Sequence, residues 1–121
     1  MADRYKEEEI LGIYAQRRKN LERKQEKNGR KIRIQELKIE QLYYLDHQIK
    51  NLIHDINVNA GEKDWKFLSE IEEDYLEYYR REVDKANDEM ADMKKEKKIL
   101  CNLEDQLERE RNTELRKLEE V

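Results

Sequence analysis

The chain has 121 residues, which is enough for one domain. It carries 26 Lys and Arg against 30 Asp and Glu, so 46% of the residues are charged and the net charge is −4, while only 36% are hydrophobic. These numbers exclude a broad core around an enclosed pocket. Because proline is absent and Glu, Lys, Leu and Arg are abundant, we expect an all-α fold of long helices that pack as in a coiled coil.

The first predicted helix covers residues 4–57. Its second half carries apolar residues spaced 3, 4, 3 and 4 apart, which predicts the contact seam of a coiled coil. The predicted seam residues are Leu42, Leu45, Ile49, Leu52 and Ile56, flanked by Ile39 and Ile53. Traced backwards, the same spacing passes through polar residues such as Gln25 and Asn28. Asn28-Gly29 is also a turn signal, but the spacing resumes in phase at Ile32, which favours a continuous helix over a break.

The segment 58–63 is predicted to be the connecting turn, because the only cluster of turn-forming residues in the chain surrounds it. We expect Gly61 to adopt a positive φ where the first helix ends. Asn59 or Asp64 is expected to cap the second helix.

The second predicted helix covers residues 64–119. Its apolar series again alternates steps of 4 and 3 and runs through Tyr75, Tyr79, Val83, Ala86, Met90, Met93, Lys97, Leu100, Glu104, Leu107, Arg111, Glu114 and Leu118. A short connection makes the two helices antiparallel neighbours, so 1–121 is predicted to form a single helical-hairpin domain. In this hairpin, residues whose numbers add up to about 121 lie opposite each other, which brings Tyr43 and Tyr44 close to Tyr78 and Tyr79 as an aromatic belt.

Charge is distributed unevenly along the predicted helices. Residues 17–33 hold nine basic residues against two acidic ones, a net charge of +7, and residues 62–92 hold twelve acidic residues against five basic ones, a net charge of −7. In the predicted register these blocks do not face each other, so both remain open to partners. Nucleic-acid binding by residues 17–33 is not favoured, because the block lacks aromatic residues for base stacking.

Several functional classes find no support in the residues. There is no Gly-rich phosphate loop, nucleophile elbow or His-Cys pair, so we expect no enzymatic activity and no cofactor. His47 and His54 are seven residues apart, whereas two ligands of one metal on a helix need a spacing of four. Cys101 is the only cysteine, so an internal disulfide is excluded. We expect Cys101 to be buried beside Leu100 as a small hydrophobic residue. Without a signal segment or a long apolar run, we expect a cytoplasmic protein with no membrane span.

The aromatic residues near the turn are the strongest functional signal. A two-helix hairpin has one seam, which cannot bury all of them, and large exposed aromatic residues are typical anchors of protein interfaces. The alternative is that they pack across the tip of the hairpin. The predicted partner-binding residues are Trp65, Phe67, Ile71, Tyr75, Tyr78, Tyr79, Tyr43 and Tyr44.

Two long helices, one turn and Trp65 at that turn resemble the WXG-type small proteins of bacterial type VII secretion. The chain is more similar to the small α-helical proteins that accompany LXG toxins in Gram-positive bacteria. The export signal Y-x-x-x-[DE] is not found after the second helix, which favours the accessory partner. The resemblance implies an adaptor or targeting chaperone that binds the helical N-terminal domain of an LXG-type toxin. Whether a second small helical protein joins this complex is left open. Whether the chain is co-secreted with the toxin is also left open.

One rival interpretation is a self-associating structural coiled coil. In it, Tyr43, Tyr79 and Trp65 close a homodimeric four-helix bundle. Both interpretations fit the thin apolar seam, because a lone hairpin with so few buried residues should be only marginally stable. We therefore expect the functional unit to be an oligomer or a complex with another protein.

Overall fold

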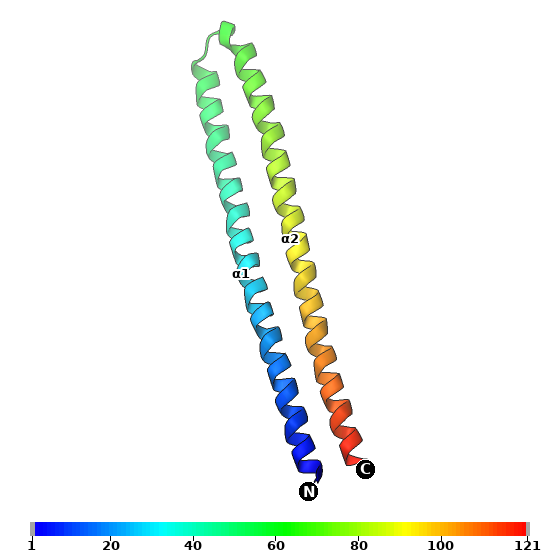
Figure 1. Ribbon diagram of the computed structural model, residues 1–121. Helices are drawn as coiled ribbons and strands as arrows, with labels where there is room; N and C mark the ends of the chain where they lie inside the picture. The colour runs from blue at the N-terminus through cyan, green and yellow to red at the C-terminus, as the bar shows by residue number, and fades with distance from the viewer. Residues whose placement is uncertain (1, 121) are drawn as a thin grey trace. The chain divides into compact units, whose positions relative to one another are not determined.

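The computed structural model describes residues 2–120, and the side chains of residues 2, 3, 62 and 63 are outside that description. Helix α1 comprises Ala2–Asn59 and helix α2 comprises Glu62–Glu119. The helices pack against each other as an antiparallel hairpin (Figure 1), which confirms the predicted all-α fold.

Two compact units divide the hairpin, and each contains part of both helices. The terminal unit consists of Met1–Lys31 and Met93–Val121, and the loop unit consists of Ile32–Asp92. The loop unit contains the connection between the helices and all the predicted partner-binding residues.

The connection is shorter than predicted, because only Ala60 and Gly61 lie outside the helices. The amide of Asn59 donates a hydrogen bond to the carbonyl oxygen of Asp55 at 2.9 Å, so this side chain supports the last turn of α1 and does not cap α2. The backbone N–H of Asp64 donates to the carbonyl oxygen of Gly61 at 3.1 Å, which places Asp64 inside the first turn of α2. No glycine of residues 2–120 has a positive φ, so that expectation for Gly61 was wrong.

Helix α1 continues through Asn28-Gly29, as predicted. Asn28 is buried, and its amide donates a hydrogen bond to the carbonyl oxygen of Met93 on α2 at 3.1 Å. A Cβ atom added to Gly29 would meet nothing within 4 Å, so packing does not require a glycine at this position. Asn28-Gly29 does not form a turn, because the Asn28 side chain is buried in the seam and bonded to α2.

The predicted seam of residues 42–56 was partly wrong. Leu42 and Ile49 turn toward α2, but Leu45, Leu52 and Ile56 are exposed. The residues that turn inward continue the spacing set by the buried Gln35, and they are Ile39, Leu42, Asp46, Ile49 and Ile53. The apolar pattern did not predict this set of inward-facing residues, because Asp46 is polar and a search for apolar residues selects Leu45 in its place.

On α2 the predicted series is largely confirmed. Ala86, Met90 and Leu100 are buried, whereas Lys97 and Glu114 are exposed. A lysine or glutamate at a seam position keeps its charged end in water, so the seam narrows at these two positions.

The predicted register is confirmed in the loop unit and only in part in the terminal unit, where the numbers of Gln25 and Glu104, joined by a hydrogen bond of 2.9 Å, add up to 129. In the loop unit, the Gln35 amide donates to the carbonyl oxygen of Ala86 at 2.8 Å, and the Tyr75 hydroxyl donates to Asp46 Oδ1 at 2.9 Å. In the terminal unit, the Asn28–Met93 bond has the same numbering relation: the two residue numbers add up to 121. Polar seam residues therefore bond to specific partners, which favours this register over neighbouring ones.

Candidate functional site

The predicted partner-binding residues do not form one surface. Six of them are exposed: Trp65, Phe67, Ile71, Tyr78, Tyr43 and Tyr44. Tyr75 and Tyr79 instead lie partly buried between the helices. Helical geometry further separates the exposed residues, since Trp65 and Phe67 are two residues apart and project to different sides of α2.

Tyr75 and Tyr79 of α2 lie partly buried in the seam, and Tyr75 forms a hydrogen bond to α1. Their rings are stacked, with centroids 6.1 Å apart and planes inclined by 22°. Asp46 accepts the Tyr75 hydroxyl at 2.9 Å and also contacts the Lys50 ammonium at 3.0 Å. Burial, followed by this hydrogen bond and the Asp46 charge, raises the pKa of Tyr75 to about 12. These two rings are thus already engaged and offer a partner little surface.

This raised pKa predicts a loss of stability in alkaline solution. Folding favours the protonated phenol, so the contribution of Tyr75 is complete below its ordinary pKa near 10 and is lost as the pH rises through 12. We expect the stability advantage of wild type over Tyr75→Phe to shrink between about pH 9 and about pH 11.5 in urea unfolding experiments. If the difference in unfolding free energy between wild type and Tyr75→Phe stays constant over this pH range, the pKa of Tyr75 is not raised by folding.

The remaining predicted residues occupy other positions. Tyr44 faces away from α2, and its hydroxyl accepts a hydrogen bond from the Gln48 amide on the same helix at 2.8 Å. Tyr43 is close enough to Tyr79 to contribute to the raised pKa of that phenol, after burial and Asp46. The aromatic belt is thus built from Tyr75 and Tyr79, with Tyr43 at its edge.

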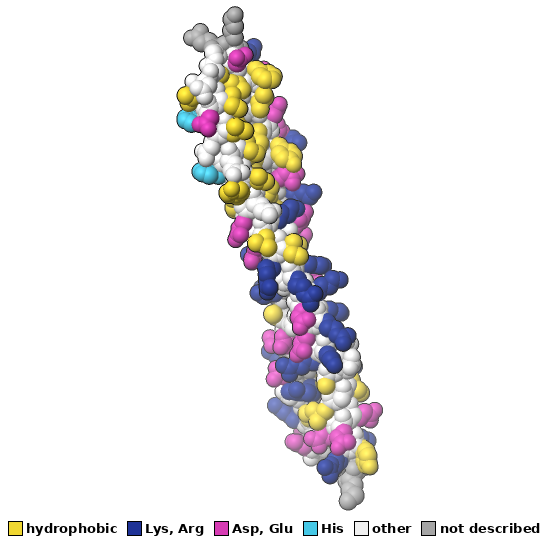
Figure 2. All heavy atoms as spheres, turned by 90° about the vertical axis from the view of Figure 1, so that its left-hand side faces the viewer, with side chains coloured by type: hydrophobic (Ala, Val, Ile, Leu, Met, Phe, Trp, Pro, Cys, Tyr) yellow, Lys and Arg dark blue, Asp and Glu magenta, His cyan; other side chains and the backbone are white. Residues whose placement is uncertain are grey.

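One side of the loop unit carries several exposed apolar side chains, and we call this side the Phe67 face. On α2, Phe67, Ile71 and Tyr78 repeat at helical spacing, and a hollow joins Phe67 to Ile56 of α1. Figure 2 shows hydrophobic side chains gathered on the loop unit. The Phe67 face consists of Leu45, Leu52, Ile56, Phe67, Ile71 and Tyr78. Its α1 residues were missed because they had been assigned to the seam.

The opposite side of the loop unit presents the Trp65 face. Trp65 is 68% exposed and lies beside a hollow that it lines with Asn57, Ala60 and Gly61 at the connection. Further along the same side of the helices, residues at helical spacing from Trp65 and Asn57 extend this surface. The Trp65 face consists of Trp65, Leu76, Tyr43, Lys50 and Asn57.

The terminal unit is dominated by charge. The Asn28–Met93 contact brings the basic residues of 17–31 beside a second basic run, 94–98, which holds four lysines against one glutamate. Lys and Arg side chains accordingly crowd the surface of this unit in Figure 2. The second run was overlooked because its proximity to the first arises only from the register of the hairpin.

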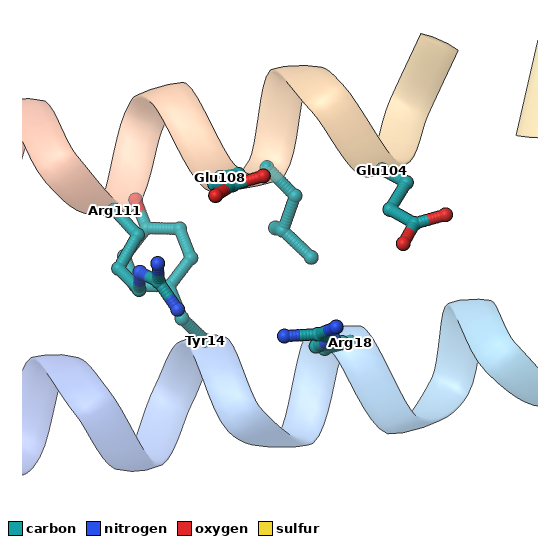
Figure 3. A pocket seen from close by; sticks show the side chains of 6 residues that line it. Tyr14, Arg18, Glu104, Glu108 and Arg111 are labelled. Carbon is teal, nitrogen blue, oxygen red and sulfur yellow. The ribbon is translucent and has the colours of Figure 1, made fainter. Parts of the chain in front are cut away.

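A small hollow between the helices of the terminal unit has a cavity volume of about 40 Å³. Tyr14 and Arg18 project from α1 toward Glu104, Glu108 and Arg111 on α2 (Figure 3). A water molecule needs about 10–15 Å³ of such space, so the hollow holds a few waters and no substrate. Its two arginines and two glutamates balance in charge, which gives it no preference for anions.

The described residues offer no group of three or more His, Cys, Asp or Glu that is arranged to hold a metal ion. His47 and His54 are exposed. Cys101 is also exposed, so the expectation that it is buried was wrong. It is one residue beyond the inward-facing Leu100 and is rotated away from α2.

Neither helix, within the part of the chain that is described, is apolar enough over a sufficient length to cross a membrane. Comparisons with protein-family models, with curated proteins and with solved structures found no match to this chain.

Proposed function

We propose that the chain is a non-enzymatic helical adaptor that captures helices of another protein on its Trp65 face. The observation that carries this proposal is the position of Trp65, which is 68% exposed at the connection and borders an open hollow. Tryptophan is enriched among residues that dominate binding energy, because a large ring that leaves water in a pocket contributes more than a rim contact.

The geometry of this face suits a helix better than an extended peptide. Its residues follow the long axes of two packed helices, with Trp65 and Leu76 on α2 beside Tyr43 and Asn57 on α1. An amphipathic helix laid along such a surface places its own apolar residues at intervals of three and four residues between those of the hairpin. A bound helix also covers apolar side chains that the thin seam leaves exposed. Because the partner binds only the folded hairpin, its binding stabilises the folded state by mass action.

The proposed partner class comes from the resemblance to the small helical proteins that accompany LXG toxins. In this proposal the chain binds the helical N-terminal domain of an LXG-type toxin, together with a second small helical protein, before type VII export. The hairpin and the exposed Trp65 at its connection support this assignment. Neighbouring genes for such a toxin and a second helical protein would strengthen it.

The test is the substitution Trp65→Ala. We expect capture of the partner to weaken by a factor of about 30 or more, the effect of removing a dominant interface residue. Binding would be measured by isothermal titration calorimetry with the purified N-terminal domain of a toxin encoded beside this chain. Circular dichroism should show unchanged helicity, because Trp65 packs little within the hairpin.

Tyr5→Ala is the matched control, since Tyr5 is an aromatic residue of similar exposure in the terminal unit. It should leave the affinity unchanged. Equal affinities of wild type and Trp65→Ala would overturn the proposed role of the Trp65 face.

A further inference from the structure

The terminal unit carries a line of cations along one side of α1, which we call the basic stripe. Helical geometry places eight exposed residues between positions 16 and 31 within about 140° of the helix circumference. Two of the eight are Gln16 and Asn20, and none is acidic, because Glu22 and Glu26 project to other sides of the helix. The other six form the basic stripe, which consists of Arg17, Arg23, Lys24, Lys27, Arg30 and Lys31.

Few acids border the basic stripe. On α1, Glu9 is the next acid in line with it toward the N-terminus. On α2, Glu110 lines a hollow together with Arg17 and Lys24, and Glu96, two heptads earlier, has the equivalent position. The six cations thus meet two acids at the edge of the stripe and one beyond its end.

The cations of the stripe are available to a ligand. The Arg30 guanidinium lies 3.8 Å from Glu26 Oε2, and both side chains are well exposed, so this pair contributes little. The Arg17 guanidinium lies over the Tyr14 ring, 5.3 Å from its centroid, which leaves its charge unpaired by a carboxylate. The other four cations form no ion pair with any residue whose side chain is described.

The hairpin adds a second basic segment to the first. Because Asn28 bonds to Met93, the run 94–98 of α2 lies beside the stripe-bearing segment 17–31 of α1. The two segments together hold twelve basic residues against three acidic ones, a net charge of +9, whereas the whole chain has a net charge of −4. The rest of the chain therefore carries a net charge of −13, and attraction of a polyanion is confined to these two segments.

We propose that the basic stripe binds the phosphate backbone of double-stranded nucleic acid. From Arg17 to Lys31 the stripe is about 21 Å long. A duplex carries one negative charge per about 1.7 Å of its axis, so the same length presents about twelve phosphates. About half of them face a protein that lies on one side of the duplex, which matches the six cations. Three of these cations are arginines, whose planar guanidinium suits a phosphate group.

The composition of the stripe favours a duplex over other polyanions. Residues 17–33 lack the aromatic residues that stack on single-stranded bases, whereas a duplex keeps its bases stacked and is held through its phosphates. The stripe also has no apolar residue. It therefore lacks both the large anchors that dominate protein interfaces and the apolar side chains that enter a bilayer.

Fluorescence anisotropy of a labelled DNA duplex of 20 base pairs and mixed sequence tests the proposal on the full chain. Wild type should bind with a Kd of about 10 µM or tighter at 50 mM NaCl. A plot of the logarithm of the binding constant against that of the salt concentration should have a slope between about −3.5 and −5.5, as expected for four to six neutralised phosphates. No anisotropy change with 100 µM protein at 50 mM NaCl would overturn the proposal.

The variant to compare is Lys27→Gln combined with Lys31→Gln. We expect its affinity for the duplex to fall by a factor of about 30 or more, and its salt slope to become less negative by about 2, because two phosphate contacts are lost. Lys66→Gln combined with Lys85→Gln is the matched control, since it removes the same charge from two exposed lysines of the loop unit. The control should bind within about threefold of wild type, and circular dichroism should show that both variants are helical. Equal losses in the two variants would show that the net charge of the chain governs binding and not the stripe.

Two other polyanions serve as competitors at the same salt concentration. Vesicles with 30% phosphatidylserine and a polyglutamate peptide of 20 residues should each bind more weakly than the duplex. If either of them binds more tightly, the stripe belongs to a membrane surface or to an acidic protein, and the assignment to nucleic acid is overturned.

This inference goes beyond the proposed adaptor function and concerns a different unit of the chain. Trp65→Ala should bind the duplex with wild-type affinity, because Trp65 belongs to the loop unit. If the duplex does not bind but the toxin domain is still captured through Trp65, only the nucleic-acid inference is overturned.

Discussion

Replacing Ala86 by leucine is expected to lower the free energy of unfolding by about 3 kcal/mol. Ala86 is 1% exposed, and its carbonyl oxygen accepts the Gln35 amide at 2.8 Å. A larger side chain forces the helices apart, and overpacking of this kind costs about 1–3 kcal/mol. The same movement breaks the hydrogen bond between Gln35 and Ala86, at a further cost of about 0.5–1.5 kcal/mol, because only the bond of the Gln35 amide to Glu89 Oε2 at 3.2 Å remains.

Urea unfolding followed by circular dichroism measures this change. Ala91→Leu is the matched control, because Ala91 is exposed on the same helix. It should alter the unfolding free energy by less than about 0.5 kcal/mol. Equal stabilities of Ala86→Leu and Ala91→Leu would show that the helices do not approach each other closely at Ala86.

The second large effect is expected from Leu100→Ala in the terminal unit. Leu100 is 6% exposed, one of the most buried side chains of the described chain. Leucine-to-alanine substitutions in cores cost about 2–5 kcal/mol. We expect a loss of about 2–3 kcal/mol, the lower part of this range, because water reaches a two-helix seam from both sides and limits the empty volume that remains.

Ile99→Ala serves as the control for Leu100, because the adjacent Ile99 is 58% exposed. It should cost less than about 0.5 kcal/mol. Hydrogen exchange should accelerate in the terminal unit of Leu100→Ala more than in its loop unit, as expected when part of a structure opens locally. Uniform acceleration along both helices would indicate that the hairpin unfolds as one cooperative body.

The consequences for function differ between the two units. The terminal unit has buried polar contacts such as Asn28–Met93 and a surface rich in Lys and Arg. The loop unit has the stacked tyrosines between its helices and exposed apolar residues on two sides. Interaction with other helices is proposed for the loop unit because Trp65 lies exposed there beside the hollow at the connection.

Much of the fold was predictable because helix period and turn residues are local properties. The absence of proline and the repeated steps of three and four residues predict two long helices and one connection near Gly61. The register of the loop unit was also predictable, since a short connection leaves little freedom in the pairing of the residues next to it. The predicted helix ends were less accurate, because the Asn59 side chain bonds to the last turn of α1 and does not cap α2.

The candidate site was predictable in composition but not in arrangement. The sequence by itself determined that this chain has more large apolar residues near the connection than one seam can bury. Only the tertiary structure decided which of them remain exposed. Asp46 takes a seam position because Tyr75 on the other helix bonds to it, and this contact turns Leu45 and Leu52 outward. The pairing joins residues distant in sequence, so no local pattern in either helix reveals it.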